Sequence, residues 1–251
     1  GEGLLLLRVW EVTRAPRHLG AAVARGEWLR HHAIRDALGC HWLRVLNPGN
    51  PRSRSRTAFS AGAAGVGHFL LALYEATADR RWAALTGETA DTLLRHAVPD
   101  GAGLSWPFTY GGDGSLAPNQ WCIGAPGIGW FLAEAAAVLR EPRYAAAACA
   151  AGRTTYAAGD LRRNPSQCHG LAGAAELFLA LYRLTGDSVW LDRAHDFAQR
   201  IMGYRTQTPD GDAWQADEPG LTSPDFFCGA AGVGHLFLRL STPEQPGLPF
   251  A

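Results

Sequence analysis

A glycine-rich phrase that occurs four times restricts the fold of this chain more than any other feature. In each copy a first glycine is followed three residues later by a second, and three of the copies have a third glycine two residues further on. The copies occupy residues 62–67, 124–129, 170–173 and 229–234. In three copies an aromatic residue stands twenty positions after the first glycine, at Trp82, Tyr144 and Trp190. Fixed offsets inside units of variable spacing indicate a repeat protein whose units share a core and differ in their loops.

Each unit has the polarity pattern of two helices. The stretch after the glycines is strongly apolar, as in residues 68–74 and 177–182, and a helix that is apolar on most sides must be surrounded by protein. The second stretch carries more charge, as in residues 190–200, which suits a helix with one face in water. We therefore expect an all-α protein of repeated helical hairpins, with an inner and an outer layer of helices.

The opening of the chain aligns with the middle of a unit. Residues 1–13 lie over residues 65–77, so the chain is expected to begin inside a hairpin. On this alignment residues 1–251 form a single domain of four and a half hairpins, which we expect to be the C-terminal portion of a longer domain. A second helix is expected from about Arg17, broken near Gly26, and then a further amphipathic helix over residues 27–46.

Two connections between the units are long. Residues 99–120 are rich in glycine and are expected to leave the helical pattern, with a short hairpin as one possibility. Residues 206–224 are expected to form a polar loop. Loops of this size in a compact domain are often functional.

The composition excludes several classes of function. The chain has 251 residues, of which 47% are hydrophobic and 18% charged, and its formal net charge is zero. Scattered charges that cancel give no reason to expect nucleic acid or an acidic membrane as a partner. The sequence contains no lysine, which excludes a Walker-type phosphate loop and a lysine Schiff base.

The cysteines and the apolar run at the start of the sequence indicate which cellular compartment to expect. Five widely spaced cysteines, an odd number, do not resemble the dense pattern of a disulfide-stapled secreted domain. A reducing compartment and a cytoplasmic location are therefore expected. The apolar run at residues 4–7 is too short to cross a bilayer, and we expect neither a signal peptide nor a membrane span.

The repeat register brings three metal-binding side chains to equivalent places. Cys122 and Cys168 stand two residues before a first glycine, and His169 stands one residue before it. If the inner helices run side by side in one direction, these places converge at one end of the bundle. Helix N-termini favour thiolates, and two thiolates with one imidazole suit zinc with an open fourth position. The alternative is that the cysteines are small residues tolerated at tight helix starts.

These motifs resemble those of the lanthionine synthetase C-like (LanC-like) family. The resemblance lies in residues 121–127, in the triplet 168–170 and in residues 226–232, and it covers nearly all of the chain. It implies an (α/α) toroid of about seven hairpins and a zinc ion held by Cys122, Cys168 and His169. It also implies cyclase activity, in which zinc activates a peptide cysteine for addition to a dehydrated serine or threonine of a precursor peptide.

The acid–base positions depart from the family pattern. Ala61 stands where the family's cyclases usually carry a histidine, and Ile123 where a tyrosine or histidine commonly follows the cysteine. Pro118 stands where an arginine is often found, and the family's acidic residue would lie before Gly1. The sequence therefore supports metal binding better than turnover.

Other residues are weaker candidates for the chemistry. His68 and His235 share the position six residues after the first glycine, where core packing or a hydrogen bond between helices competes with a catalytic role. Asp113 lies in the glycine-rich loop before the first of the two paired cysteines, but Gly-Asp-Gly is also ordinary turn sequence. Cys228 shares the position of His169 and is a possible extra ligand, although four protein ligands would close the site.

Two functional hypotheses follow. The first is a zinc-dependent cyclase that forms lanthionine or methyllanthionine by adding cysteine thiols to dehydrated serine or threonine residues. The second is a zinc-bearing scaffold that binds a precursor peptide or a partner enzyme, such as a dehydratase, kinase or lyase, without turnover. A glycosidase would need paired carboxylates near its cavity, and the positions at the helix starts hold none.

Overall fold

The computed structural model describes residues 1–43, 55–159, 164–209, 211–215 and 220–245. Its helices are α1 (Glu2–Thr13), α2 (Pro16–His31), α3 (Ala63–Thr77), α4 (Arg80–Arg95), α5 (Ala125–Leu139), α6 (Pro142–Ala158), α7 (Leu171–Thr185), α8 (Ser188–Met202) and α9 (Ala230–Ser241). Its strands pair as antiparallel hairpins, β1 (Ile34–Asp36) with β2 (Gly39–His41), β3 (Val98–Asp100) with β4 (Gly103–Ser105) and β5 (Thr206–Thr208) with β6 (Gly211–Ala213). The predicted helical fold is confirmed.

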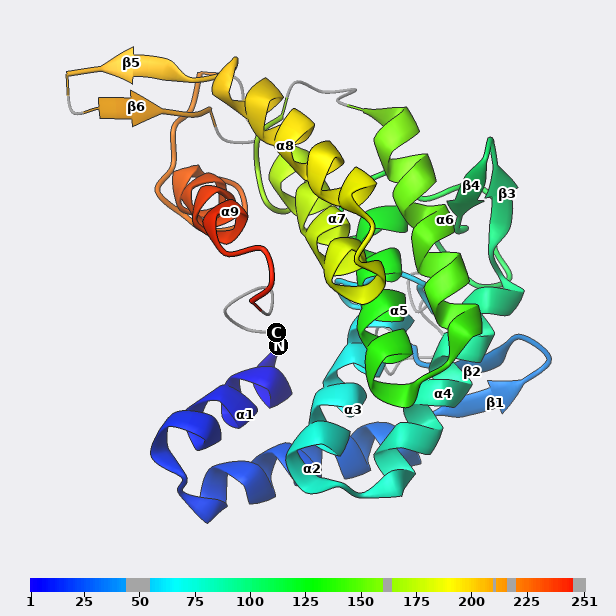
Figure 1. Cartoon of the computed structure of the whole chain (residues 1–251). Helices are drawn as coiled ribbons and strands as arrows, with labels where there is room; N and C mark the ends of the chain where they lie inside the picture. Colours follow the sequence, from blue (N-terminus) through cyan, green and yellow to red (C-terminus); the bar gives the residue numbers. More distant parts are fainter. Residues whose placement is uncertain (44–54, 160–163, 210, 216–219, 246–251) are drawn as a thin grey trace.

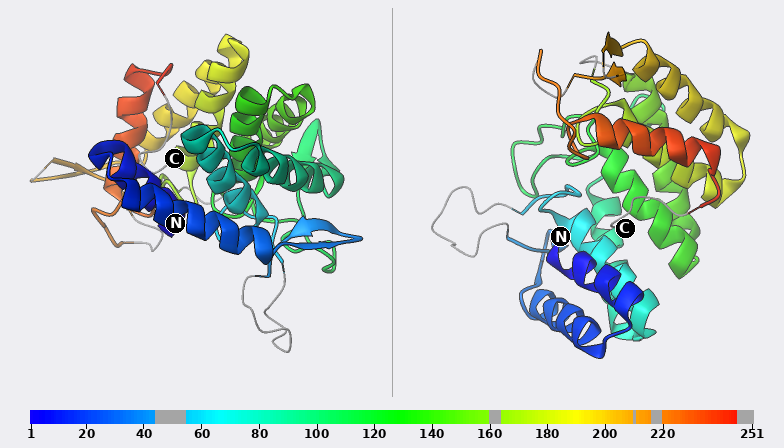
Figure 2. Two further views of the ribbon diagram at one scale, coloured as in Figure 1. Left: turned by 90° about the horizontal axis from the view of Figure 1, so that it is seen from below. Right: turned by 90° about the vertical axis from the view of Figure 1, so that its left-hand side faces the viewer.

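The helices form the two predicted layers along an arc (Figures 1 and 2). Helices α1, α3, α5, α7 and α9 follow one another as the inner layer, and α2, α4, α6 and α8 each pack against the inner helix before them. The three β hairpins each follow an outer helix, α2, α4 and α8 (Figure 1). Within the described residues there are thus four helical hairpins and a further inner helix, α9, as the repeat predicts.

The aromatic residues twenty positions after the first glycine pack each outer helix against the preceding one. Trp82, Tyr144 and Trp190 are 0%, 3% and 5% exposed, and burying such a ring contributes about 1.5–3 kcal/mol. Each side chain contacts a glycine of the preceding outer helix, Trp82 and Trp190 with the ring and Tyr144 with its hydroxyl. The pairs are Trp82 with Gly26, Tyr144 with Gly87 and Trp190 with Gly152. The repeat therefore contains a second recurring contact, an aromatic side chain packed on a glycine of the neighbouring outer helix.

This packing corrects the prediction that Gly26 breaks the second helix. Helix α2 is continuous from Pro16 to His31. A Cβ on Gly26 would lie 2.4 Å from Cδ1 of Leu73 and 3.1 Å from the ring of Trp82. The glycine is required because the helices approach closely there, and tertiary packing outweighs the weak helix propensity of glycine.

The predicted helix over residues 27–46 is also wrong in its described part, which ends at residue 43. Helix α2 ends at His31, and the hairpin β1–β2 follows. In its turn the N–H of Leu38 donates to the carboxylate of Asp36 at 2.8 Å. Gly39 has φ 110°, a conformation that side chains other than glycine rarely adopt. The expected short hairpin within the connection 99–120 is present as β3–β4, whose first residue is Val98.

The second glycine of each phrase allows the chain to fold back on the start of its own inner helix. A Cβ on Gly127 would lie 1.9 Å from the carbonyl oxygen of Trp121. A Cβ on the equivalent glycines would lie equally close, at 1.9–2.1 Å, to the carbonyl oxygen six residues earlier. The pairs are Gly65 with Phe59, Gly173 with Gln167 and Gly232 with Phe226. No side chain fits such a contact, so this glycine sets the path of the residues that precede each inner helix.

Three tryptophans at equivalent positions, which were not recognised in the sequence as a repeat, form hydrogen bonds to the C-terminal ends of outer helices. Trp42, Trp106 and Trp214 follow the three β hairpins. The indole N–H of each donates to the carbonyl thirteen residues earlier, at 2.8–2.9 Å, near the end of the outer helix. Carbonyls in the last turn of a helix have no partner inside the helix, so each tryptophan satisfies one of them and ties the hairpin to the helix.

Helix α4 begins with a side-chain cap that yields a stability prediction. The carboxylate of Asp79 accepts a hydrogen bond from the N–H of Arg81 at 3.0 Å. Asp79→Ala is expected to lower the free energy of unfolding by about 1 kcal/mol in urea titrations, because an N–H at the helix start loses its partner. Asp79→Asn keeps the acceptor and should lose less. Equal losses in the two variants would assign the effect to the charge instead of the cap.

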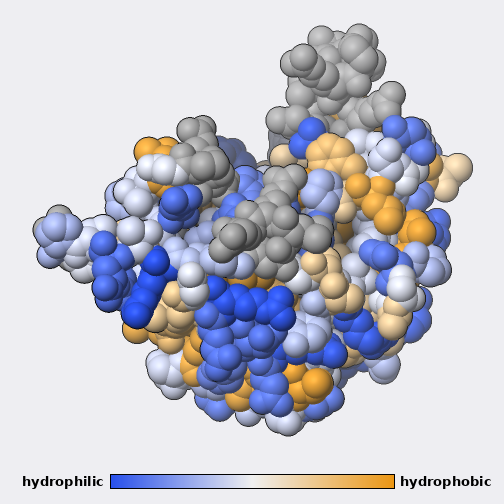
Figure 3. All heavy atoms as spheres, turned by 90° about the horizontal axis from the view of Figure 1, so that it is seen from above, coloured by the Kyte–Doolittle hydropathy of each residue, from blue (hydrophilic) through white to orange (hydrophobic). Residues whose placement is uncertain are grey.

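The surface mixes polar and apolar side chains. Hydrophilic residues are interspersed with small hydrophobic patches on the face seen from above (Figure 3). Among the described residues, no helix combines the length and the apolar character that a membrane span needs.

Candidate metal centre

Backbone hydrogen bonds join the segments that precede successive inner helices. The N–H of Ser60 donates to the carbonyl of Cys122 at 2.6 Å, and the N–H of Cys122 donates to the carbonyl of Cys168 at 3.4 Å. The N–H of Cys168 donates in turn to the carbonyl of Phe227 at 2.7 Å. All four residues stand two positions before a first glycine. We call these three bonds the inter-repeat ladder, and it places residues that are distant in sequence side by side.

The inter-repeat ladder brings Cys122, Cys168 and His169 together at the N-terminal ends of α5 and α7. Their ligand atoms all lie within 4.8 Å of one another. Ligand atoms of a tetrahedral zinc ion with bonds of about 2.0–2.3 Å stand roughly 3.3–3.8 Å apart, so side-chain shifts of about 1 Å would suffice for binding. Cys122 is buried, whereas Cys168 and His169 are half-buried. No other set of His, Cys, Asp or Glu among the described residues forms such a group.

The thiol of Cys122 is poised to ionise near neutral pH. A hydrogen bond with Cys168 is the largest cause that lowers the pKa of Cys122, to about 7, and the nearby charge of His169 lowers it further. Burial opposes this shift because it disfavours the charged form. Zinc binds the thiolate and not the thiol. The donor set and the ionisation of Cys122 therefore both fit a zinc ion.

Alkylation of the metal-free protein is expected to report this pKa. Modification of Cys122 by iodoacetamide should reach half of its maximal rate near pH 7 and increase with pH, because the thiolate is the reactive form. Cys149 on α6 is the internal control, since burial raises its pKa above the ordinary value of 9.0. Mass-spectrometric mapping of both sites across pH gives the two profiles. A Cys122 profile that coincides with that of Cys149 would contradict the shift.

The neighbouring repeats place different side chains around the cluster. Ser60 and Ala61 stand at the equivalent positions on one side, and Phe227 and Cys228 on the other. Cys228 is not a member of the group that meets within 4.8 Å, and its N–H donates to the carboxylate of Asp225 at 2.7 Å. Phe227 is 41% exposed and lies beside the buried Trp121, with the ring centroids 6.2 Å apart.

The acid–base candidates His68 and Asp113 lie outside the metal-ligand group. His68 is buried between the rings of Phe59 and Trp130, at centroid distances of 5.5 and 4.8 Å. Neither of its ring nitrogens has a hydrogen-bond partner within the described residues, and burial lowers its pKa to about 4. Asp113 accepts a hydrogen bond from the N–H of Ser115 at 2.9 Å in an exposed turn.

The third candidate, His235, belongs to a buried ionic cluster that the sequence analysis missed. Nδ1 of His235 lies 3.2 Å from one carboxylate oxygen of Glu176, and Nε of Arg239 lies 3.8 Å from the other. The Glu176 side chain is fully buried. Glu176 in α7 occupies the same repeat position as His235 in α9, and this equivalence was the available signal. The cluster links two adjacent inner helices.

The fold and the site together define a class of protein, an (α/α) toroid with a candidate metal centre where neighbouring inner helices begin. Residues 4–251 match the family model described as lanthionine synthetase C-like protein. The chain belongs to this family.

Comparison with individual proteins supports the same fold. The chain is 33% identical over 141 residues to the Danio rerio protein glutathione S-transferase LANCL1, a match that covers 55% of this chain and 32% of that protein. Nisin cyclase has a TM-score of 0.69 at 14% identity, covering 98% of this chain and 62% of that one. A family 76 glycoside hydrolase from a bovine Bacteroides thetaiotaomicron strain has a TM-score of 0.68 at 13% identity, with coverage of 98% and 56%.

The similar solved structures show the fold of this chain and not its reaction. At 13–14% identity the two solved structures show the toroid fold alone, and one fold hosts different chemistries. The match to the curated relative spans about a third of that protein's length. The chemistry of this chain therefore depends on the residues of its site and not on its fold.

Proposed function

We propose that the chain is a zinc-dependent cyclase that forms lanthionine or methyllanthionine in a dehydrated precursor peptide. The observation that carries the proposal is the meeting of Cys122, Cys168 and His169 within 4.8 Å in a LanC-like chain. In the reaction, the sulfur of a peptide cysteine forms a bond to the β-carbon of a dehydrated serine or threonine. The thiol proton is lost and one proton is gained at the α-carbon, so the mass is unchanged.

Each ligand has a defined task in this proposal. Cys122 and Cys168 would bind zinc as thiolates, and His169 as a neutral imidazole. When bound, zinc supplies the Lewis acidity that keeps a peptide thiol deprotonated at neutral pH and still nucleophilic. The N-terminal ends of α5 and α7 favour the negative charge of the two thiolates.

The surroundings of the cluster determine access and protonation. Phe227 and Trp121 form an apolar wall beside Cys168, against which a peptide side chain can pack and exclude water. The side chains of Ala61 and Ile123 carry no acidic proton that could be transferred to the α-carbon. We therefore assign that step to water or to a residue outside this group.

A second candidate function is a zinc-bearing scaffold that binds the peptide, or a dehydratase, kinase or lyase partner, without turnover. The side chains of Ala61, Ile123 and Pro118 favour this alternative, because they replace acid–base groups of the cyclase pattern with groups that cannot donate or accept protons. Both functions require reduced thiols, and we place the protein in the cytoplasm.

Incubation with a dehydrated precursor peptide tests the proposal. The zinc-loaded chain should remove free peptide thiol faster than the uncatalysed reaction at constant peptide mass, and thiol titration with mass spectrometry measures both. Binding without thiol loss would support the scaffold. Glutathione, tested as the thiol donor in a parallel reaction, distinguishes a cyclase from a transferase of the kind that the Danio rerio relative's name describes. Less than about a tenth of an equivalent of bound zinc would exclude both zinc functions.

A further inference from the structure

A cavity of about 560 Å³ lies against the inner helices α1, α3 and α5. Its described lining residues all belong to these helices, apart from Arg14 directly after α1. The outer helices contribute none of these residues, so the cavity opens on the side of the inner layer that faces the inside of the arc (Figure 1). Arg14 is exposed, and its guanidinium lies 5.2 Å from the centroid of the Trp10 ring. We call this space the luminal cavity.

The repeat register places the polar lining residues along one face of the inner helices. His68 and Glu75 stand six and thirteen residues after the first glycine of their phrase, and Glu134 stands ten residues after the first glycine of the next. Steps of three and four residues keep side chains on one helix face. At about 1.5 Å per residue, His68 and Glu75 are separated by roughly 10 Å along α3. The luminal cavity therefore has a histidine at one end and carboxylates at the other.

The carboxylate end of the luminal cavity has one acid without a cationic partner. Arg8 pairs with Glu11 at 2.6 Å, and Arg183 pairs with Glu134. The Glu75 side chain has no ion pair or hydrogen bond within the described residues. It is accessible to solvent, yet the protein around the cavity raises its pKa, and the charges of Glu134 and Glu11 raise it further. A cation placed here would relieve this repulsion. These acids are not among the groups that could hold a metal ion, so an organic cation fits better.

The opposite end of the luminal cavity offers an unused hydrogen-bonding group. His68 is 6% exposed, and neither of its ring nitrogens has a partner within the described residues. Buried polar groups in folded proteins nearly always have one. Burial lowers the pKa of His68 to about 4, so its neutral ring can donate one hydrogen bond and accept another. Leu7, Leu71 and Trp130 add apolar surface to the same cavity.

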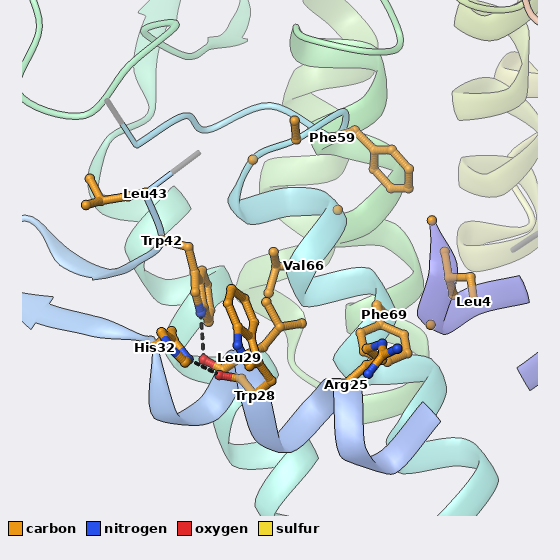
Figure 4. Close-up of a pocket in the computed structure, with 15 residues that line it drawn as sticks. Leu4, Arg25, Trp28, Leu29, His32, Trp42, Leu43, Phe59, Val66 and Phe69 are labelled. Carbon is orange, nitrogen blue, oxygen red and sulfur yellow. Dashed lines mark hydrogen bonds between the residues drawn. The ribbon is translucent and has the colours of Figure 1, made fainter. Parts of the chain in front are cut away.

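A neighbouring cavity provides a contrast in charge. It has a volume of about 400 Å³, and Figure 4 shows Trp28, Trp42 and Val66 among the side chains around it. None of its described lining residues is acidic. Arg25, which also lines it, pairs with Glu2 at 2.7 Å. A positively charged ligand therefore finds acidic partners in the luminal cavity and none among the residues that line this second one.

We propose that the luminal cavity binds a lysine side chain of a peptide, with the ammonium beside Glu75 and Glu134 and the peptide amide beside His68. The carboxylates come from different helices, which suits the compact ammonium of lysine better than the flat guanidinium of arginine. The aliphatic stem packs against Leu7 and Leu71. Glu134 stands roughly 15 Å along α5 from the helix start, where the metal-ligand group lies. The site is therefore separate from the metal centre and goes beyond the proposed thiol addition.

Titration of the metal-free chain with a model lysine compound tests this inference. The probe is Nα-acetyl-lysine N-methylamide, and Nα-acetyl-norleucine N-methylamide is the control, which has the same carbon stem and no ammonium. NMR titration of the chain labelled with ¹⁵N-histidine gives the affinities, and His68→Phe identifies the His68 signals. The norleucine compound should bind at least about tenfold more weakly, because it lacks the charge-assisted hydrogen bonds. The lysine compound should shift the His68 ring signals. Equal affinities, or unchanged His68 signals, would overturn the inference.

A third compound distinguishes a peptide lysine from a free amine. Pentylamine has the ammonium and the stem but no amide, so it should bind more weakly than the lysine compound and leave the His68 signals unchanged. Pentylamine binding as tight as that of the lysine compound would overturn the assignment to a peptide.

Two variants locate the binding. Glu75→Gln keeps the size of the side chain and removes its charge, so the affinity for the lysine compound should fall at least about tenfold, while that for the norleucine compound changes less than about twofold. Asp192→Asn removes an exposed carboxylate from the outer helix α8 and is the matched control, expected to stay within about twofold. Unchanged affinity in Glu75→Gln, or equal losses in both variants, would contradict the site. None of these measurements uses zinc or thiol addition, so this inference and the proposed function can fail separately.

Discussion

Cys122→Ala is expected to abolish stoichiometric zinc binding and to lower the rate of thioether formation at least about 100-fold. Loss of a single group that only orients a ligand already costs about 10–100-fold in metal affinity or activity, and Cys122 would be a ligand itself. The remaining Cys168 and His169 cannot hold zinc tightly with two bonds. Zinc content by elemental analysis and the rate of peptide thiol loss measure the two effects.

Cys149→Ala is the matched control for this variant. Cys149 lies on the outer helix α6 and is not a member of the metal-ligand group. Its replacement should leave both zinc content and rate within about twofold of the original chain. Full zinc content in Cys122→Ala, or equal losses in the two variants, would remove Cys122 from the proposed centre. Cys168→Ala should reproduce the Cys122→Ala result, because both thiolates are required.

Gly127→Ala is expected to destabilise the fold by about 3 kcal/mol or more. The added methyl group would lie 1.9 Å from the carbonyl oxygen of Trp121 and 2.9 Å from the Cβ of Phe59. Backbone atoms cannot move aside as a flexible side chain can, so the segment that holds Trp121 and Cys122 must shift. Chemical denaturation measures the loss, and zinc affinity should fall with it because the inter-repeat ladder passes through Cys122.

Gly234→Ala is expected to stabilise the fold, in contrast to Gly127→Ala, although both glycines belong to a glycine-rich phrase. Gly234 lies inside α9, and a Cβ there meets nothing within 4 Å. Alanine has the higher helix propensity, so this variant should gain about 0.5–1 kcal/mol. If the two alanine variants lost similar amounts, the contact with the Trp121 carbonyl would not be the reason for the glycine.

The layered arrangement was predictable because it depends on local patterns. Apolar runs such as residues 177–182 indicate inner helices and charged stretches such as residues 190–200 outer ones, and the structure has both. The candidate site was predictable for a related reason. Repeats that stack in register bring equivalent positions together, so Cys122, Cys168 and His169 could be grouped without knowing any distance. Their role as zinc ligands remains a prediction.

The errors occurred where a residue acts through a distant partner. Gly26 resembles a helix break when only neighbouring residues are considered, but it lies inside α2 because Leu73 and Trp82 need the space. Trp106 carries no local signal for its role, since its hydrogen bond to the Leu93 carbonyl depends on the path of the hairpin between them. The buried pairing of Glu176 with His235 likewise joins two helices whose contact the sequence does not reveal.

The sequence by itself determined the periodic properties of this protein: a stack of helical hairpins, the glycines at the start of each inner helix and three candidate metal ligands in one register. Periodicity is written in neighbouring residues, because each hairpin must bury an apolar face against the next. Only the tertiary structure decided how closely the helices approach, which carbonyls the tryptophans satisfy and that Glu176 pairs with His235. Those features depend on contacts between residues far apart in the chain, and such contacts exist only after the hairpins have packed.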